Sequence, residues 1–199
     1  MAPPSWLSTL VWTEYRLAVV FFVVVPLILL VWTFIQRFPA LERLLIIYWR
    51  VSSLLAITVY LMMAALPVSF LTAFGVLILI PLSLWYWVDI NEELADRSGW
   101  LAGVANVWRW AATLLAGLGA LIQIPFLGCA FKSTGALLET AQCRVWLEPP
   151  WGFKALFHAN IPIRTLGFWG LVALVVYGFC LAYFLLVRLG RQGRAALNP

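Results

Sequence analysis

Four carboxylates stand close together in the middle of the chain: Asp89, Glu92, Glu93 and Asp96. The spacing i, i+3, i+4, i+7 would place all four on one face if the preceding helix continues through them. Acidic motifs of this kind hold Mg²⁺ and a diphosphate in membrane transferases, but they need a second acidic cluster on a facing helix, and the sequence has none. The run also lacks the Asp-Gly-x-x-Ala-Arg pattern of membrane alcohol phosphotransferases. We therefore expect a solvated face, partly neutralised by Arg97 and Arg43, or a surface that docks a basic partner.

The single histidine, His158, limits the metal and cofactor chemistry of the chain. One imidazole excludes a bis-histidine haem within the chain and a pair of metal-ligating histidines, although it could ligate the magnesium of a chlorophyll. The segment WLEPPWGFKALFHANIPIR places Lys154 and His158 on one helical face and aromatic side chains on others. This pattern favours a short helix at the membrane interface, and we predict no bound cofactor or metal. The sequence also contains no Gly-rich phosphate loop, no G-x-S-x-G elbow and no H-E-x-x-H run.

Two of the three cysteines, Cys129 and Cys143, bound the segment CAFKSTGALLETAQC, which the topology below places outside the cytoplasm. Two cysteines that flank an exported loop favour a disulfide. Cys180 falls within the last apolar run, where a free cysteine acts as a small apolar side chain.

One strongly polar side chain, Gln123, lies inside a predicted span. It shares a helical face with three small residues: Ala112, Ala116 and Ala120. Small residues at intervals of four let another helix approach closely, and an amide can hydrogen-bond across the contact. We expect packing here rather than a substrate pathway, the other role that a polar group can have inside a membrane. Gly178 and Ala182 give the last span a similar face, which could dock a helix of this chain or of a partner.

The composition indicates a membrane protein. Hydrophobic residues make up 64% of the 199-residue chain and charged residues 11%, which is more apolar surface than a soluble domain of this length can bury. The stretch 51–88 contains no Asp, Glu, Lys, Arg or His, and as one helix it would be roughly 57 Å long against a hydrocarbon core of about 30 Å. It must therefore fold back. Pro67 marks the turn, because proline interrupts a helix and disfavours helical geometry at Leu66.

We therefore predict an all-α fold, a single polytopic bundle over residues 1–199. Five spans are expected, joined in part by a long outer connector at 132–164: 17–35, 44–66, 68–88, 108–131 and 165–187. Pro26 should kink the first span, and Pro39 should lie in the first turn of the helix that contains the second. We expect the first span to be retained, since neither an early basic region nor a small-residue cleavage site typical of a signal peptide occurs.

The basic residues indicate an orientation. If loops 36–50 and 89–109 and the tail 188–199 share one side, that side holds eight of the 13 Lys and Arg residues and the other side holds five. The positive-inside rule then places the carboxyl terminus in the cytoplasm and the amino terminus outside. Six tryptophans would form an aromatic belt at the cytoplasmic boundary: Trp32, Trp49, Trp85, Trp87, Trp108 and Trp110. The net charge of +5 is spread over short connectors without a Lys/Arg-rich run, so nucleic-acid binding is not expected.

Several long strings resemble a cyanobacterial integral membrane family known only as a domain of unknown function: LLIIYWRVSSLLAITVYLM, SLWYWVDINEE, IQIPFLGCAF, VWLEPPWGFKALFHAN and RLGRQGR. The resemblance covers nearly the whole chain. It implies a source among oxygenic phototrophs and a place in the thylakoid or plasma membrane, with the outer side facing the lumen or the periplasm. It implies no activity and no catalytic residue.

The function we expect is that of a non-catalytic accessory subunit, assembly factor or scaffold of a larger membrane complex, which the resemblance implies is photosynthetic. This expectation rests on several helix-docking faces and on the lack of a convergent acid, base and nucleophile. A small-molecule or ion transporter is the alternative, although the sequence has no internal inverted repeat and only one strongly polar residue within the spans. A membrane enzyme is the third interpretation. The expected partners are the lipid bilayer and a membrane protein.

Overall fold

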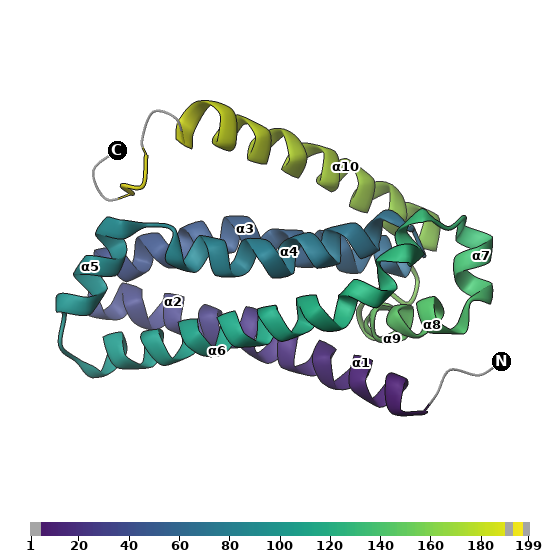
Figure 1. Ribbon diagram of the computed structural model, residues 1–199, viewed down its shortest axis with the longest axis horizontal. Coiled ribbons are helices and arrows are strands. Elements are labelled where there is room, and N and C mark those ends of the chain that lie inside the picture. Colours follow the sequence, from purple (N-terminus) through teal and green to yellow (C-terminus); the bar gives the residue numbers. More distant parts are fainter. Residues whose placement is uncertain (1–4, 190–192, 197–199) are drawn as a thin grey trace.

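A computed structural model describes residues 5–189 and 193–196, and this part of the chain is helical with no β-strand. Five segments of it are long and apolar enough to cross a membrane: Ser5–Gln36, Pro39–Met63, Val68–Trp85, Trp100–Phe131 and Ile163–Arg188. Figure 1 shows them side by side as a bundle, with the last segment standing above the other four. The prediction of an all-α fold with five spans is confirmed.

The first segment has three consecutive parts: α1 (Ser5–Ala18), the π-helical turn η1 (Val19–Val24) and α2 (Val25–Gln36). Pro26 has no N–H to donate to the carbonyl of Phe22, four residues earlier, so the helix widens there instead of breaking. The hydroxyl of Tyr48 donates to that carbonyl at 2.7 Å, and the indole of Trp108 donates to the carbonyl of Phe21 at 2.8 Å. The kink predicted at Pro26 is thus a π turn whose carbonyls accept hydrogen bonds from neighbouring helices.

This first segment begins at Ser5 rather than at residue 17, and its 32 residues make it roughly 48 Å long. The early start has a tertiary cause. Leu7 and Val11 are buried, and the hydroxyl of Ser8 donates to the carboxylate of Glu148 at 3.3 Å. Because the helix is longer than predicted, Glu14 lies inside it and not in a flanking tail.

The apolar stretch 51–88 folds back between α3 (Pro39–Met63) and α4 (Val68–Trp85). Ala65 has a left-handed φ of 51°, and Pro67 caps the start of α4, so the reversal is confined to a short turn. The hydroxyl of Thr58 donates to that of Thr72 at 2.9 Å across the two helices. The hairpin with its turn at Pro67 and the helix start at Pro39 are both confirmed.

The acidic run does not continue the hairpin. α4 ends at Trp85, and the four acids belong to a separate helix, α5 (Val88–Asp96). Trp87 is buried with extended backbone angles, and the Asn91 amide donates to the carbonyl of Trp85 at 3.0 Å. The helix before the acidic run therefore does not continue through it, because these tertiary contacts accompany its end.

α6 (Trp100–Gln123) passes directly into the 3₁₀ segment η2 (Ile124–Phe131), so the fourth span begins at Trp100 rather than at residue 108. The connector that follows contains four short helical elements: α7 (Thr134–Glu139), α8 (Ala141–Arg144), η3 (Val145–Leu147) and α9 (Glu148–Phe157). A disulfide joins Cys129 to Cys143, with Cα atoms 5.8 Å apart, which confirms the predicted bond. It ties the connector to the end of the fourth span.

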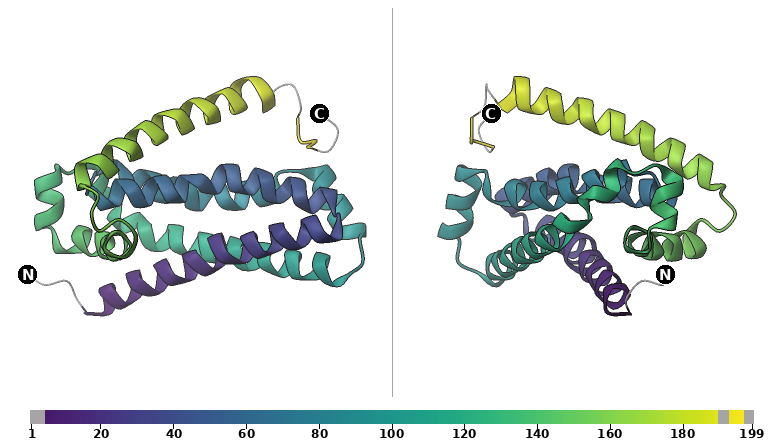
Figure 2. Two further views of the ribbon diagram at one scale, coloured as in Figure 1. Left: turned by 180° about the vertical axis from the view of Figure 1, so that it is seen from behind. Right: turned by 45° about the vertical axis from the view of Figure 1, so that its right-hand side comes forward.

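The last span, α10 (Ile163–Tyr183) followed by the π-helical η4 (Phe184–Arg188), stands apart from the other four. Figures 1 and 2 show it diverging from the bundle along its length. Its contact with α3 is closest near its start. A Cβ added at Gly167 would lie 2.7 Å from the Cβ of Ala64, and one at Gly170 would lie 3.2 Å from the side chain of Leu61.

The connecting segments gather at two ends of the molecule (Figure 1). We call one the α5 end: it carries α5, the turn at Arg37 and the described tail 193–196. The other, the α9 end, carries the hairpin turn and the helices α7 to α9. The described parts of the segments that were grouped by charge thus share one end, while the side of the membrane that this end faces stays a prediction.

The predicted aromatic belt lies partly inside the protein. The rings of Trp85 and Trp110 contact each other near the α5 end, tilted by 51° with centroids 4.7 Å apart. Trp87 and Trp108 are buried, with 5% and 3% of their surface exposed. Two of the six tryptophans therefore pack in the core and not against the membrane boundary.

Candidate functional site

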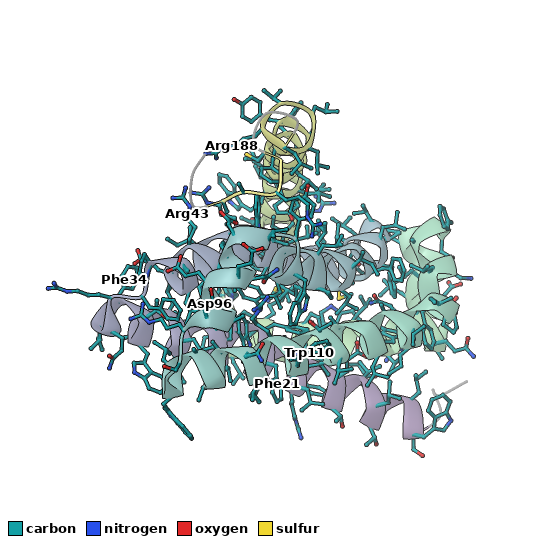
Figure 3. All side chains as sticks on the ribbon, turned by 60° about the vertical axis from the view of Figure 1, so that its left-hand side comes forward. Phe21, Phe34, Arg43, Asp96, Trp110 and Arg188 are labelled. Atoms are coloured by element: carbon teal, nitrogen blue, oxygen red, sulfur yellow. A yellow bond between two sulfur atoms is a disulfide. The ribbon has the colours of Figure 1, made fainter. Side chains whose placement is uncertain are left out.

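The four acids share the outer face of α5, whose inner face buries Ile90 and Leu94. Glu92 and Asp96 are exposed, whereas Asp89 and Glu93 are partly buried. Figure 3 is turned to bring the α5 end forward, with Asp96 and Arg43 labelled there. Glu92, Glu93 and Asp96 form no ion pair with any described residue. The i, i+3, i+4, i+7 face exists, but on a short amphipathic helix of its own.

Asp89 is occupied by the chain's own tail. One of its carboxylate oxygens accepts a hydrogen bond from the backbone N–H of Ala196 at 2.6 Å, and the N–H of Val88 donates to the carbonyl of Arg194 at 3.1 Å. The Nε–H of Arg43 donates to the carbonyl of Ala196 at 3.1 Å. Asp89 also lies in the first turn of α5, where a negative charge favours the helix dipole. Asp89 thus has a structural role that the other three acids do not share.

The expected neutralisation by arginines takes another form. The guanidinium of Arg97 lies 4.2 Å from the ring centroid of Phe38, a cation–π contact, and not in an ion pair with Glu93. Arg43 bonds the tail, as described above. Neither of these two arginines pairs with Glu92, Glu93 or Asp96 in the part of the chain that the structure describes.

Arg109 is a buried arginine that the sequence analysis had counted in a connecting loop. Only 2% of its surface is exposed, and its Nη2 donates to the carbonyl of Leu84 at 2.7 Å and to the side chain of Asn91. The guanidinium also lies 4.0 Å from the ring centroid of Trp85. The first bond satisfies one of the last carbonyls of α4, and the bond to Asn91 fixes α5 beside it. The string VWRWAAT, an arginine between tryptophans at the start of an apolar run, was the available signal.

The small-residue face of α6 is filled within the chain. All four of its predicted members are buried: Ala112, Ala116, Ala120 and Gln123. The amide of Gln123 is 2% exposed, and its Oε1 has no hydrogen-bond partner. This face lies inside the bundle, so its partner helices belong to the same chain.

The small-residue face of α10 is open. Gly178 and Ala182 are exposed, and a Cβ added at Gly178 would meet nothing within 4 Å. Gly167 and Gly170, which the sequence analysis did not single out, make the close contact with α3 instead. The prediction gave both spans a docking face, but within this chain only the face on α6 is used.

Glu14 is the carboxylate that sequence reasoning missed. A Cβ added at Gly119 would lie 2.9 Å from its Oε1 and 3.4 Å from Cδ1 of Leu77, which is the tenth of the 18 residues of α4. The carboxylate therefore lies level with the middle of a span. Translocon scales give about 2.5–3.5 kcal/mol for a charged side chain at a helix centre. The residue was overlooked because the first span was expected to begin at residue 17.

His158 follows α9, the short helix expected at this position. Its Nε2 is 3.0 Å from the hydroxyl of Tyr60, and its Nδ1 is shielded from solvent without a hydrogen-bond partner. The ring packs against those of Tyr60 and Phe153, with centroids 5.5 Å and 5.9 Å away. One ring nitrogen is therefore hydrogen-bonded in the structure, and the other is enclosed without a partner.

A family model described as "protein of unknown function (DUF3177)" matches residues 8–197. The chain belongs to the DUF3177 family. This confirms the expected membership of a family of unknown function, and the match includes four of the five spans in full and all but the first three residues of the other. No curated protein and no solved structure matches the chain.

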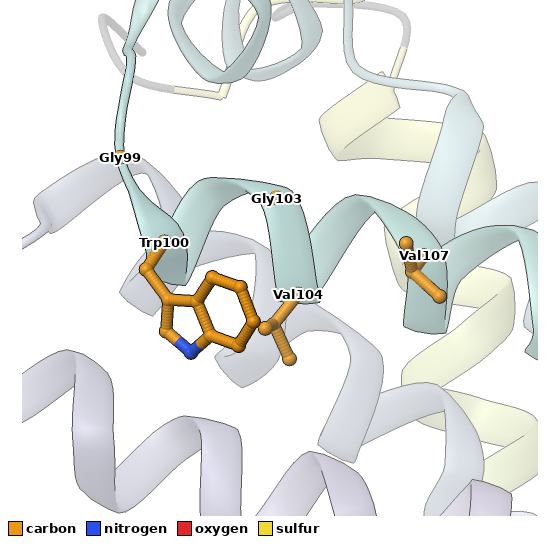
Figure 4. Close-up of a pocket in the computed structure, with 5 residues that line it drawn as sticks. All are labelled: Gly99, Trp100, Gly103, Val104 and Val107. Carbon is orange, nitrogen blue, oxygen red and sulfur yellow. The ribbon is translucent and has the colours of Figure 1, made fainter.

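The DUF3177 chain also has a shallow groove of about 610 Å³ beside the start of α6. It is lined by five residues, drawn in Figure 4: Gly99, Trp100, Gly103, Val104 and Val107. None of them has an acid, base or nucleophile, so the groove suits an acyl chain better than a polar substrate. Within the described residues, no group of three or more His, Cys, Asp or Glu side chains could hold a metal ion.

Proposed function

We propose that this DUF3177 chain is a non-catalytic accessory subunit or assembly factor of a larger membrane complex. The observation that carries the proposal is the open face of α10, where Gly178 and Ala182 meet no helix of their own chain. Small residues one turn apart permit close approach of a second helix, whereas contact with lipid does not require them. A membrane helix of another protein would fill this face.

The acidic face of α5 is a second contact region for the same partner. η4, at the far end of α10, reaches the α5 end, where the rings of Phe184 and Trp87 are 6.1 Å apart between centroids. Glu92, Glu93 and Asp96 therefore lie at the end of the bundle that the open half of α10 approaches (Figure 1). A partner with a small-residue helix and a basic extramembrane segment suits both regions.

The charge of the acidic face gives the proposal a test of its own. Replacing Glu92 and Glu93 with Gln should loosen a co-purifying complex and flatten the salt dependence of its association, because exposed charges are screened over about 10 Å at 0.1 M salt. The double variant should keep the five-span fold. Unchanged association and unchanged salt dependence would show that the face is merely solvated.

The topology proposed is amino terminus outside and carboxyl terminus cytoplasmic, supported by the eight-to-five division of basic residues. The resemblance to a cyanobacterial family supports a thylakoid or plasma membrane and, with it, a photosynthetic complex. A reporter fused after Pro199 that is active only outside the cytoplasm would overturn the topology.

A proton-coupled or ion transporter is the second candidate function. The spans contain a carboxylate, Glu14, in addition to the amide of Gln123. Polar groups within spans mark ion and proton pathways in many transporters. Against this, the groove at the start of α6 is lined by apolar residues and glycines.

Purification in a mild detergent separates the two functions. An accessory subunit should elute with at least one further membrane protein in a fixed ratio, and that ratio should persist after a second native separation step. A stable monomer that retains neither subunit nor pigment would oppose the proposal and favour transport.

A further inference from the structure

Glu14 is an acidic residue at the level of the middle of a membrane-spanning helix. Its carboxylate reaches from α1 to the glycine face of α6, beside Leu77 in the middle of α4. Its Oε2 is shielded from solvent and has no hydrogen-bond partner, and no described residue forms an ion pair with it. An ionised carboxylate with one oxygen so enclosed would lose part of its solvation and gain no counter-charge from the described residues.

The contact between α1 and α6 forms a cradle for this carboxyl group. Gly119 leaves the space that the Oε1 atom approaches, since any larger residue would place a Cβ within 2.9 Å of it. Gln123 lies one turn further along the same buried face of α6, and its Oε1 also lacks a donor. Glu14 Oε2 and Gln123 Oε1 are thus two enclosed oxygens that accept no hydrogen bond in the structure.

The surrounding elements supply no compensating charge at this level. α4, η1 and η3 contain no titratable residue, and the cysteine of η2 is in the disulfide. The one cation of α6, Arg109, is ten residues from Gly119 and is bonded to Leu84 and Asn91. In α9, Glu148 accepts from Ser8, and Lys154 bonds backbone carbonyls after the helix.

The remaining titratable groups of α1 are Tyr15 and Arg16, the neighbours of Glu14 in the chain. Arg16 is exposed, and its guanidinium lies 5.9 Å from the ring centroid of Trp12. It therefore points to the boundary of the protein and not into the cradle.

We propose that Glu14, together with Gln123, is a proton-binding site within the membrane. The carboxylate takes up one proton to become the neutral acid, and the new O–H becomes a donor for which the Gln123 Oε1 is the available acceptor. Release of the proton restores the carboxylate. The site is independent of whether α10 docks a partner, so each proposal can fail without the other.

The test uses N,N′-dicyclohexylcarbodiimide, an apolar reagent that modifies protonated carboxyl groups in membranes. The carboxyl oxygen bonds to the central carbon of the reagent, the proton moves to one nitrogen, and the adduct rearranges to a stable N-acylurea, so no further reactant is needed. The whole chain is reconstituted in phosphatidylcholine and phosphatidylglycerol vesicles, labelled at a series of pH values, and mapped by peptide mass spectrometry. Glu139, an exposed acid of α7, is the internal control.

Glu14 should be labelled in large excess over Glu139, and its labelling should fall as the pH is raised. A water-soluble carbodiimide should reverse the preference. Labelling of Glu14 no greater than that of Glu139, or labelling that does not change with pH, would overturn the proposal. Glu14→Gln should remove the adduct from this peptide, which verifies the assignment.

Two glycine variants test the cradle without removing the carboxyl group. Gly119→Ala displaces the carboxyl from the contact with α6, so the pH of half-maximal labelling should fall as the group gains access to water. Gly117→Ala is the matched control, because a Cβ there meets nothing within 4 Å. Its pH profile should coincide with that of the unmodified chain. Identical pH profiles of Glu14 labelling in the two variants would contradict the contact between the carboxyl group and Gly119. If Gly119→Ala does not fold, the pH profile of the unmodified chain still decides the proposal.

Discussion

α6 and α10 both carry a stripe of small residues, and the structure uses them differently. On α6 the stripe is buried against helices of the same chain, and the disulfide at Cys129 fastens the segment that continues from it. On α10 the glycines that pack closely against α3 are Gly167 and Gly170, whereas Gly178 and Ala182 face outward. The difference shows that such a stripe predicts a helix contact without saying whether the partner helix belongs to the same chain.

The largest expected loss of stability comes from removing the disulfide that fastens the segment after α6. Replacing Cys129 and Cys143 with Ala opens a loop of about 15 residues, for which the chain-entropy model gives about 3 kcal/mol of stability. The free energy of unfolding in detergent, followed by tryptophan fluorescence, should fall by about that amount. Cys180→Ala should leave it unchanged, since this cysteine is unpaired and exposed. Equal effects of the two changes would mean that the disulfide does not hold the α9 end.

A leucine scan of the two stripes sharpens the comparison. Ala116→Leu overfills a site with no exposed surface, and such overpacking costs about 1–3 kcal/mol. Gly178→Leu adds a side chain where nothing lies within 4 Å, so the free energy of unfolding of the isolated chain should change by no more than about 0.5 kcal/mol. The same titration measures both. A large loss for Gly178→Leu alone would indicate that α10 packs on its own bundle through this face.

Two tyrosine hydroxyls extend the comparison to single hydrogen bonds. Tyr48→Phe leaves the carbonyl of Phe22 without the donor that replaces the missing N–H of Pro26, which should cost about 1–3 kcal/mol. Tyr177→Phe removes a partly buried bond from α10 to the carbonyl of Val51, at 3.2 Å, and should cost about 0.5–1.5 kcal/mol. Unfolding titrations of the two variants in parallel would test this order. The reverse order would show that α10 is the more tightly held element.

Features encoded locally could be predicted from the sequence. Pro67 fixes the hairpin turn and Pro39 the start of α3 through the geometry of proline itself. The disulfide followed from two cysteines around one connector, and the buried face of α6 from its spacing of small residues.

Features that depend on tertiary contacts could not be predicted. α4 ends at Trp85 because of Asn91 and a buried Trp87, whereas the local pattern favoured continuation. Glu14 was left out of the predicted first span because the uncharged run begins at residue 17. In the structure the helix begins at Ser5, where contacts such as that of Ser8 with Glu148 of α9 hold its first turns. The sequence could not tell that Gly167 and Gly170 would be used and Gly178 left open, since all lie on one apolar helix.

The most direct test of the accessory-subunit proposal is the native size of the complex when the open face of α10 is filled. Gly178→Leu with Ala182→Leu should release the chain from a larger complex to a monomer on native gels after mild solubilisation, with its unfolding profile unchanged. Gly117→Leu, on the exposed side of α6, is the matched control and should leave the complex intact. A complex of unchanged size in the double variant, or a monomer in the unmodified chain, would contradict the proposal that α10 docks a partner.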